Sequence, residues 1–361
     1  MQWLPAILIA PYIFILLKIY RSLYTIKPFN TSTDPAIFVS VVVACHNEEE
    51  RLPQLLKSLA IQNYKQELFE IIIVDDSSTD QTFEVANGYS GIKNIITINN
   101  KGTGKKKAIR TGIEAATGKL IITTDADCQM GSSWLSSIAA FYKHHKPDMI
   151  ICPVQLESGP GFFNRFQELE FLSLQGITAG SALIGTPTMC NGANLSFTRE
   201  AYFSNSDNLH DEIRSGDDIF LLHSLKKNHS NILWLESPDA MIKTASSPTI
   251  GSFLKQRRRW ISKGKVYSDS FTILLGIVTF LAVIVQVSLL VAGIFCPQFF
   301  WVFLLVFLLK SVPDFLILRN TAGRYGKIEL MRWFIQSQIV YPFYVLIVAI
   351  YSLISNSKQR K

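Results

Sequence analysis

The sequence is poor in cysteine, and its cysteines form no pattern that would give them a structural role. The five residues Cys45, Cys128, Cys152, Cys190 and Cys296 include no CxxC pair and no paired spacing. This excludes a disulfide-stapled scaffold and leaves no cysteine-based metal site. The sequence also lacks internal repeats and low-complexity linkers. Its 361 residues are enough for one large domain and an additional part.

Charge is the second scarce property, because 17% of the residues are charged while 48% are hydrophobic. Residues 271–296 contain no charged side chain, and as a helix they would reach about 39 Å, enough to cross a bilayer. Apolar runs also cover residues 299–318 and 333–354. Three residues interrupt the run at 299–318: Lys310, Pro313 and Asp314. We expect about three membrane helices within residues 271–361, with a buried core helix as the alternative for residues 299–318.

A further apolar run lies at the N-terminus, in residues 4–17. No basic residue precedes it and no small-x-small cleavage site is evident, whereas Lys18, Arg21 and Lys27 come after it. A secretory signal has its basic residues in front. Because basic residues favour the cytoplasmic side of a membrane, we predict that residues 1–27 are a retained anchor and that the chain then enters the cytoplasm.

Basic clusters give the same orientation for the C-terminal helices. The stretch KQRRRWISKGK, residues 255–265, precedes the first long apolar run, and the loop at residues 319–332 is also basic. Both should lie on the cytoplasmic side. The basic tail at residues 355–361 disagrees, since three complete crossings would place it outside. We expect a multi-pass protein of the cell (inner) membrane with its central region in the cytoplasm.

The central region alternates between two periodicities. Continuous apolar runs, typical of strands buried on both faces, occupy residues 38–45, 69–76, 94–99 and 120–125. Segments with helical spacing lie at residues 46–62 and 103–117, and Asp80 is well placed as the N-cap of another helix. This order predicts an α/β fold with a mostly parallel sheet, whose ligands bind beyond the carboxyl ends of the strands.

Acidic and polar residues collect where those strands end, in the stretches ACHNE, VDDSST and TTDAD. Asp125 and Asp127 would point to the same side if the strand geometry continued through both. Two carboxylates so placed repel each other unless a cation lies near, and oxygen ligands suit Mg²⁺ or Mn²⁺. The alternative is a polar turn in which one aspartate caps the helix expected at the GSSW stretch.

The pattern is looser in the following segment. Residues 148–156 suit a strand, and residues 162–175 suit an amphipathic helix. Residues 176–197 are rich in glycine and threonine, which predicts a mobile loop that lines a site. The SGDD stretch then opens a helix with Asp217 and Asp218 in its first turn, where acids also favour the helix dipole without any catalytic role.

Six separated motifs carry a resemblance to a known family. They are VVVACHNEE, IIIVDDSSTD, KGTGKKKAIRTGI with the following ATG, DAD, SGDDIFL, and QRRRW, which fits Gln-x-x-Arg-Trp. Over residues 38 to about 265 the chain resembles the membrane-anchored, inverting family 2 glycosyltransferases with the GT-A fold. The resemblance implies a cytoplasmic GT-A catalytic domain at residues 28–240 and an interfacial segment at residues 241–270. The sequence departs from the family's usual Gly-Lys-Ala followed by Leu-Asn, because Lys106 and Arg110 add charge.

The resemblance also implies roles for individual residues. Asp218 would be the catalytic base, and Asp127 would hold a divalent metal, Mg²⁺ or Mn²⁺, on the pyrophosphate of the donor. Asp125 would contact the nucleoside or the sugar, and Asp76 would face the nucleobase, which is uracil in most relatives. The other residues of the nucleotide-sugar pocket would be Ala44, His46, Glu48 and Lys105. The acceptor and the leaving diphosphate would lie near Asp217, Gln256, Arg259 and Trp260.

The expected activity is hexosyl transfer from a nucleotide-diphosphate sugar, with a UDP-sugar favoured, to a lipid, lipid-linked or polysaccharide acceptor at the membrane. A cation and nearby arginines would stabilise the charge that develops on the departing diphosphate, and one carboxylate would take the proton of the weakly nucleophilic hydroxyl. Two alternatives are a non-catalytic sugar-nucleotide-binding subunit of a polysaccharide assembly complex and a nucleotidyltransferase. A polysaccharide synthase of this size would need membrane partner subunits, and no nucleic acid partner is expected.

Overall fold

The computed structural model of the protein describes residues 4–30, 35–210, 213 and 215–358. The chain forms two compact units. The sheet unit comprises Ile26–Glu157 and Met189–Ala245, and the helical unit comprises Met1–Thr25, Ser158–Thr188 and Ser246–Lys361. Residues 158–188, which fall inside the expected catalytic domain, therefore group with the C-terminal helices.

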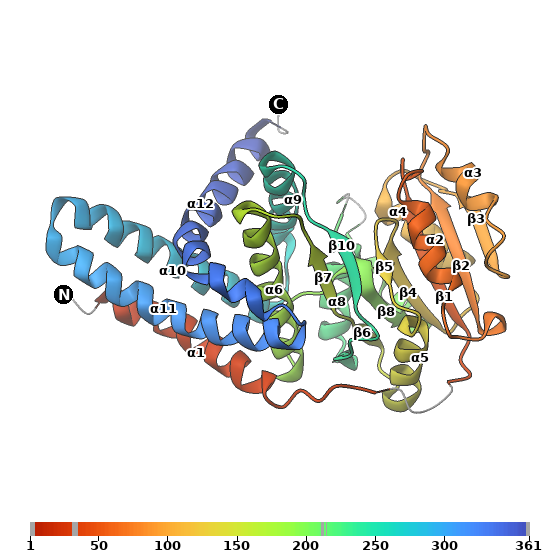
Figure 1. The fold of residues 1–361 in the computed structure, drawn as a ribbon, viewed down its shortest axis with the longest axis horizontal. Helices are drawn as coiled ribbons and strands as arrows, with labels where there is room; N and C mark the ends of the chain where they lie inside the picture. Colours follow the sequence, from red (N-terminus) through yellow and green to blue (C-terminus); the bar gives the residue numbers. More distant parts are fainter. Residues whose placement is uncertain (1–3, 31–34, 211–212, 214, 359–361) are drawn as a thin grey trace. The chain divides into compact units, whose positions relative to one another are not determined.

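The sheet unit is built on a seven-stranded sheet with the strand order β3-β2-β1-β4-β8-β6-β9 (Figure 1). Its strands are β1 (Val39–Cys45), β2 (Phe69–Asp75), β3 (Ile95–Asn99), β4 (Leu120–Asp125), β6 (Met149–Ile151), β8 (Leu195–Thr198) and β9 (Ile232–Trp234). β1 pairs in parallel with β2 and β4, and β2 pairs in parallel with β3, whereas β8 is antiparallel to β4 and β6. The mostly parallel sheet predicted from the sequence is confirmed, with β1 to β4 where the apolar runs placed them.

A second, three-stranded sheet has the order β5-β10-β7. Its strands are β5 (Gln129–Met130), β7 (Val154–Glu157) and β10 (Ile242–Ala245). The single strand expected at residues 148–156 is therefore wrong, because the chain leaves β6 and enters β7 in the other sheet. Pro153 lies between the two strands, and a proline has no N–H to continue a ladder of hydrogen bonds.

The helices of the sheet unit are α2 (Leu52–Ala60), α3 (Thr82–Asn87), α4 (Lys105–Ala115), α5 (Trp134–His145), α7 (Arg199–Phe203) and α8 (Asp217–Lys227). All seven residues of β2 are buried, as expected for a strand covered on both faces. α4 packs tightly on the sheet at Gly112, where an added Cβ would approach Val42 Cγ1 to 2.4 Å. Glycine therefore fixes how closely α4 lies on the strands.

Two helix starts differ from the predictions. The helix expected from residue 46 begins at Leu52, since Pro53 favours the first turn of a helix. The N-cap of α3 is Gln81 rather than Asp80. Asp80 still serves the start of this helix, because its Oδ1 accepts a hydrogen bond of 3.0 Å from the backbone N–H of Thr82.

The helical unit contains α1 (Leu4–Leu23), α6 (Phe162–Leu183), α9 (Ile250–Ser262), α10 (Ser270–Phe295), α11 (Pro297–Arg324) and α12 (Phe334–Lys358). α10 and α11 meet at Cys296 and run back along each other (Figure 1). Within the described part of the chain, three stretches are long and apolar enough to cross a membrane: Ser270–Phe295, Pro297–Arg324 and Ile328–Ile354. The expected C-terminal apolar helices are confirmed.

The loop expected at residues 176–197 is wrong for its first part, because α6 continues to Leu183. A Cβ on Gly176 would approach Thr321 Oγ1 to 2.4 Å, and one on Gly180 would approach Ile19 Cγ2 to 2.6 Å. These glycines thus allow α6 to pack closely on α11 and α1. A glycine-rich stretch indicates close packing here as well as turn formation.

Candidate active site

The carboxyl ends of β1, β2 and β4 lie side by side at one edge of the main sheet. Ala44 of β1 is directly opposite Asp125 of β4. His46 follows β1, and its Nδ1 lies 2.8 Å from the carbonyl oxygen of Asp76, which follows β2. The registers of the strands thus bring four of the predicted site residues to the edge where open parallel sheets bind ligands.

Asp76 holds the glycine loop that precedes α4. Its Oδ1 accepts hydrogen bonds from the Nδ2 of Asn100 at 2.6 Å and from the backbone N–H of Gly104 at 2.8 Å. Gly104 has a φ of 91°, a conformation that L side chains rarely adopt. Asn100 and Gly104 are absent from the sequence-based predictions, and the turn-forming GTG stretch is the signal that points to them.

Lys105, the first residue of α4, binds Asp125. Its Nζ lies 2.5 Å from Asp125 Oδ1, and both side chains are partly exposed. Although burial acts to lower it, the pKa of Lys105 lies above its usual range because of the carboxylates of Asp125, Asp217 and Asp218. One ammonium group therefore faces acids from β4 and from α8.

Asp127 does not continue the strand that ends at Asp125. The backbone N–H of Cys128 donates to the carbonyl oxygen of Asp125 at 3.1 Å, so that the chain turns here. Strand geometry therefore does not set the relative direction of the two aspartates. The prediction that both side chains point to the same side required the strand to continue through Asp127, and it does not. The Oδ2 of Asp127 accepts a hydrogen bond of 3.3 Å from the hydroxyl of Thr244 on β10.

Glu48 belongs to the same group of acids. Burial raises its pKa, and the charges of Asp127 and Asp125 raise it further, against an opposing ion pair of 3.4 Å with Arg51. Glu48, Asp125 and Asp127 therefore act on one another, although they come from two different strand ends. Their mutual repulsion marks a place where a cation is favourable.

Asp218 lies in the first turn of α8, and two backbone groups orient it. Its Oδ2 accepts from the N–H of Gly192 at 3.1 Å, and its Oδ1 accepts from the N–H of Ile219 at 2.8 Å. Gly192 begins the short helix η2 (Gly192–Asn194), and its carbonyl accepts from the hydroxyl of Thr123 on β4 at 2.7 Å. The strand that carries Asp125 thus also positions Asp218, a connection that the sequence did not reveal.

Lys106 joins α4 to the segment that leads into α8. Its side chain is buried, and its Nζ donates to the carbonyl oxygens of Leu209 and of His210, the latter at 2.6 Å. The ammonium also lies 5.3 Å from the ring centre of Phe220 on α8. The positive charge of Lys106, which departs from the family pattern, therefore makes contacts within the sheet unit.

Gln256, Arg259 and Trp260 lie on α9 in the helical unit. Arg257, between them, is the buried residue of the arginine run, with its NH2 group 2.5 Å from Glu170 Oε2. Its guanidinium lies 4.2 Å from the ring centre of Trp260, and it donates to the side-chain oxygen of Gln256. Arg259 is exposed. The sequence did not distinguish Arg257 from its neighbours.

Residues 40–205 match the family model described as glycosyl transferase family 2. They form a family 2 glycosyltransferase domain. The matched range includes the strand ends of β1, β2 and β4 and the start of α4. Asp218 lies beyond it.

Curated relatives match this glycosyltransferase domain over part of their length. Poly(ribitol-phosphate) β-N-acetylglucosaminyltransferase TarS of Staphylococcus aureus is 31% identical over 126 residues, which is 34% of this chain and 22% of TarS. Undecaprenyl-phosphate 4-deoxy-4-formamido-L-arabinose transferase of Proteus mirabilis is 42% identical over 96 residues, which is 25% of this chain and 29% of that enzyme. The chain thus spans less than a third of the length of these two relatives.

A solved structure extends the likeness in fold beyond the glycosyltransferase domain. The mannosyltransferase PcManGT from Pyrobaculum calidifontis, in complex with GDP-Man and Mn²⁺, superposes with a TM-score of 0.60. It shares 17% sequence identity, and the match covers 98% of this chain and 99% of that one. The GT-A-like arrangement of a mostly parallel sheet flanked by helices is therefore shared.

The donor set of the glycosyltransferase domain fits a divalent cation shared with phosphates. Among residues 4–30, 35–210, 213 and 215–358, no group of three or more His, Cys, Asp or Glu side chains gathers as a metal cage. Mg²⁺ is commonly held by one or two carboxylates together with substrate phosphates and water. Asp127, half-buried beside Asp125 and Glu48, is suited to that kind of site.

Proposed function

We propose that the protein is a membrane-bound inverting glycosyltransferase. It would move a sugar from a nucleotide-diphosphate sugar, with UDP as the expected nucleotide, to a lipid or lipid-linked acceptor. The single observation that carries this proposal is the ion pair of Lys105 with Asp125 at the carboxyl edge of the sheet in the family 2 domain, where the charges of Asp217 and Asp218 on α8 also raise the pKa of Lys105. A donor site and a separate carboxylate base are the two parts that inversion requires.

The base is Asp218. The N–H groups of Gly192 and Ile219 hold its two oxygens, so the carboxylate keeps one orientation while an acceptor hydroxyl approaches. Taking the proton of that hydroxyl as it attacks speeds the reaction by about 10² to 10⁴-fold in typical enzymes. Attack from the face opposite the leaving nucleotide, with a single base, inverts the sugar's configuration.

The leaving diphosphate is stabilised at the other end of the site. Asp127 would hold Mg²⁺ or Mn²⁺, and the bound ion would supply Lewis-acid stabilisation of negative charge on the diphosphate. Lys105 supplies a second positive charge from the start of α4, and Asp125 orients its ammonium. Ala44, His46, Glu48 and Asp76 shape the nucleotide pocket. Gln256, Arg259 and Trp260 of α9 would bind the acceptor, as the family resemblance implies.

A lipid or lipid-linked acceptor suits the chain better than a long polysaccharide. Of the two curated relatives described above, one is named for a polymer acceptor and the other for undecaprenyl phosphate. Three C-terminal stretches are apolar enough to cross a membrane within the described residues, which is few for an extrusion channel in one chain. The sheet unit would lie on the cytoplasmic side of the cell membrane, as the basic stretch at residues 255–265 indicates.

The test is a donor panel with the purified full chain in detergent. Nucleotide release and product mass are measured with UDP- and GDP-sugars, Mn²⁺ and lipid acceptors. Asp218→Asn should lower the turnover by about 10² to 10⁴-fold, while Asp239→Asn, at an exposed turn of the sheet unit, should leave it unchanged. Full activity in Asp218→Asn would remove the base assignment, and donor binding without release from any sugar would favour the non-catalytic subunit.

A further inference from the structure

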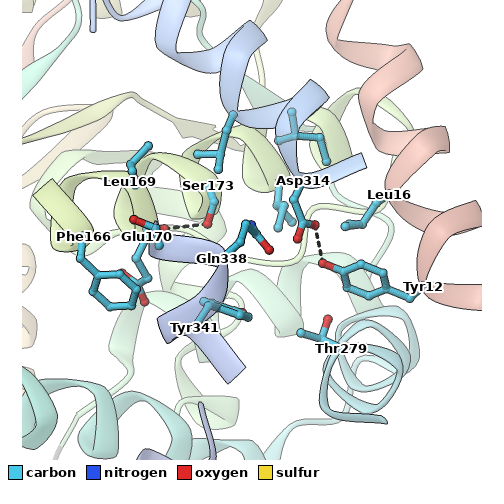
Figure 2. Close-up of a pocket in the computed structure, with 14 residues that line it drawn as sticks. Tyr12, Leu16, Phe166, Leu169, Glu170, Ser173, Thr279, Asp314, Gln338 and Tyr341 are labelled. Carbon is cyan, nitrogen blue, oxygen red and sulfur yellow. Dashed lines mark hydrogen bonds between the residues drawn. The ribbon is translucent and has the colours of Figure 1, made fainter. Parts of the chain in front are cut away.

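The helical unit contains a partly open cavity of about 70 Å³ between α1, α6, α10, α11 and α12 (Figure 2). This volume has room for about two water molecules or for a polar headgroup of a few heavy atoms. Its lining mixes two kinds of side chain. Leu16, Leu169 and Ile317 are apolar, whereas Thr279 and Gln338 are polar and uncharged. Such a mixed lining suits an amphiphile.

The charged groups of this cavity are already neutralised. Asp314 accepts from the hydroxyl of Tyr12 at 2.5 Å, as Figure 2 shows, and from Lys310 Nζ at 2.7 Å. Glu170 pairs with the buried Arg257. The acids and bases cancel one to one, so a phosphate entering the cavity would meet no uncompensated cation. A cavity whose charges are paired in this way suits a neutral ligand and disfavours a charged one.

One hydroxyl of the lining lacks a hydrogen-bond partner. Ser337 lines the cavity on the first turn of α12, is 7% exposed, and its Oγ has no partner in the part of the chain that the structure describes. A buried hydroxyl without a partner is unfavourable, above all where lipid replaces water. A ligand hydroxyl in the cavity would satisfy it.

The position of the cavity among apolar helices favours access from a bilayer. Thr279, Asp314 and Ser337 lie on the three stretches that are apolar enough to cross a membrane. The outward faces of these helices carry exposed apolar side chains, such as Ile277 and Ile347. We propose that this cavity binds the neutral, hydroxyl-bearing headgroup of a membrane lipid of the diacylglycerol kind. The proposal concerns lipid binding and does not depend on the transferase activity.

The test uses the full chain in detergent micelles with a photoactivatable diacylglycerol. Labelling should saturate, and unlabelled diacylglycerol should compete while undecaprenyl phosphate should not. Ser337→Leu, which fills the cavity, should lower labelling at least tenfold. Ser352→Leu is the matched control, because Ser352 is equally buried on α12 and does not line the cavity. Unchanged labelling of Ser337→Leu, or no saturable labelling of the wild type, would overturn the proposal.

A second variant covers the case in which both leucine substitutions prevent folding. Thr279→Val keeps the shape of the side chain and removes only its hydroxyl, so the protein should elute as the wild type does. A several-fold loss of labelling then supports the proposed lipid site, and undiminished labelling overturns it.

Competition by undecaprenyl phosphate instead of diacylglycerol would show that the ligand is charged and would overturn the assignment to a neutral lipid. Nucleotide release is measured separately, so failure of the transferase proposal remains distinguishable.

Discussion

The two units differ in the balance of their charged side chains. At the carboxyl edge of the sheet, acids outnumber bases. One partly exposed ammonium, Lys105, faces Asp125, Asp217 and Asp218, and Asp127 adds to the same negative field. Such a surplus is unfavourable until a cation arrives.

The helical unit balances its buried charges instead. Arg257 pairs with Glu170, and Lys310 pairs with Asp314, with all four side chains at most 10% exposed. An ion pair whose charges cancel leaves no net charge to attract another ion. Loss of such a pair should lower the stability of the fold more than the rate of the reaction. The comparison teaches that an excess of acids distinguishes the edge of the sheet, where we propose that a cation binds, whereas paired charges hold the helical unit together.

The largest effect should come from removing the cation or its ligand. Chelation by EDTA should abolish nucleotide release, and Mn²⁺ or Mg²⁺ should restore it. Asp127→Asn should lower turnover by about 10² to 10⁴-fold, since a metal ion supplies several kcal/mol of transition-state stabilisation. The measurement is nucleotide release at saturating donor. Activity that is indifferent to chelator would show that Lys105 alone suffices at the diphosphate.

The next largest effect is on stability, in the helical unit. Glu170→Gln leaves Arg257 buried without its counterion, which should cost about 3 to 5 kcal/mol. The midpoint of thermal unfolding in detergent should fall sharply. Glu157→Gln is the control, because its pair with Lys243 is exposed at 2.9 Å and should be worth less than about 1 kcal/mol. Equal shifts for the two variants would refute the contrast between the units.

A double variant sharpens the same point. Glu170→Gln combined with Arg257→Met removes both charges and should recover much of the lost stability, because no buried ion then remains uncompensated. Failure to recover would indicate that the guanidinium's contacts with the rings of Phe253 and Trp260, rather than its charge, hold α9 in place.

The sheet and its acidic edge were predictable because they follow from local rules. Apolar runs such as residues 69–75 specify strands covered on both faces, and parallel strands bring their carboxyl ends together. The polar residues after each strand, Asp76 and Asp125 among them, could therefore be assigned to one edge of the sheet from the amino-acid pattern alone.

The contacts that orient the site were not predictable, because they join residues far apart in the chain. Asp218 is held by Gly192, and Gly192 is held by Thr123 of β4. The helical glycines 176 and 180 were mistaken for loop signals for the same reason, since the partners that require them lie on α11 and α1. Long-range packing overrides local propensity at such positions.

A smaller effect, on turnover, should follow from cutting the tie between α4 and α8. Lys106→Met removes the ammonium that binds the carbonyls of Leu209 and His210. We expect about a tenfold loss of kcat with little change in the KM for the donor, because the loss affects the position of Asp218 rather than donor binding. Lys106→Arg should restore part of it.

The matched control is Arg110→Met, the other charge that departs from the family pattern. Arg110 pairs with the half-exposed Glu114 at 3.2 Å on the surface of α4. Its loss should leave kcat within about twofold of the wild type. If both variants behave alike, the effect of Lys106→Met reflects general weakening of α4.

The smallest expected effect tests the acid surplus directly. The raised pKa of Glu48 means that its folded form holds its proton more tightly than the unfolded chain does. The contribution of Glu48 to the free energy of unfolding is therefore fully present below the ordinary pKa of 4.5, and it is lost as the pH rises through the raised pKa. Glu48→Gln avoids this loss, so it should match the wild type at pH 4 and exceed it by about 1 kcal/mol or less at pH 7.

Metal should narrow that difference. Mn²⁺ beside Asp127 would offset the repulsion that Glu48 experiences, so thermal unfolding at pH 7 with saturating Mn²⁺ should bring Glu48→Gln and the wild type closer together. The same measurement with Glu67→Gln, an exposed acid of the sheet unit that pairs with Lys93, should show no pH-dependent gain. If Mn²⁺ left the extra stability of Glu48→Gln unchanged, the repulsion among these acids would be independent of cation binding. The excess of acids would then no longer identify the proposed cation site.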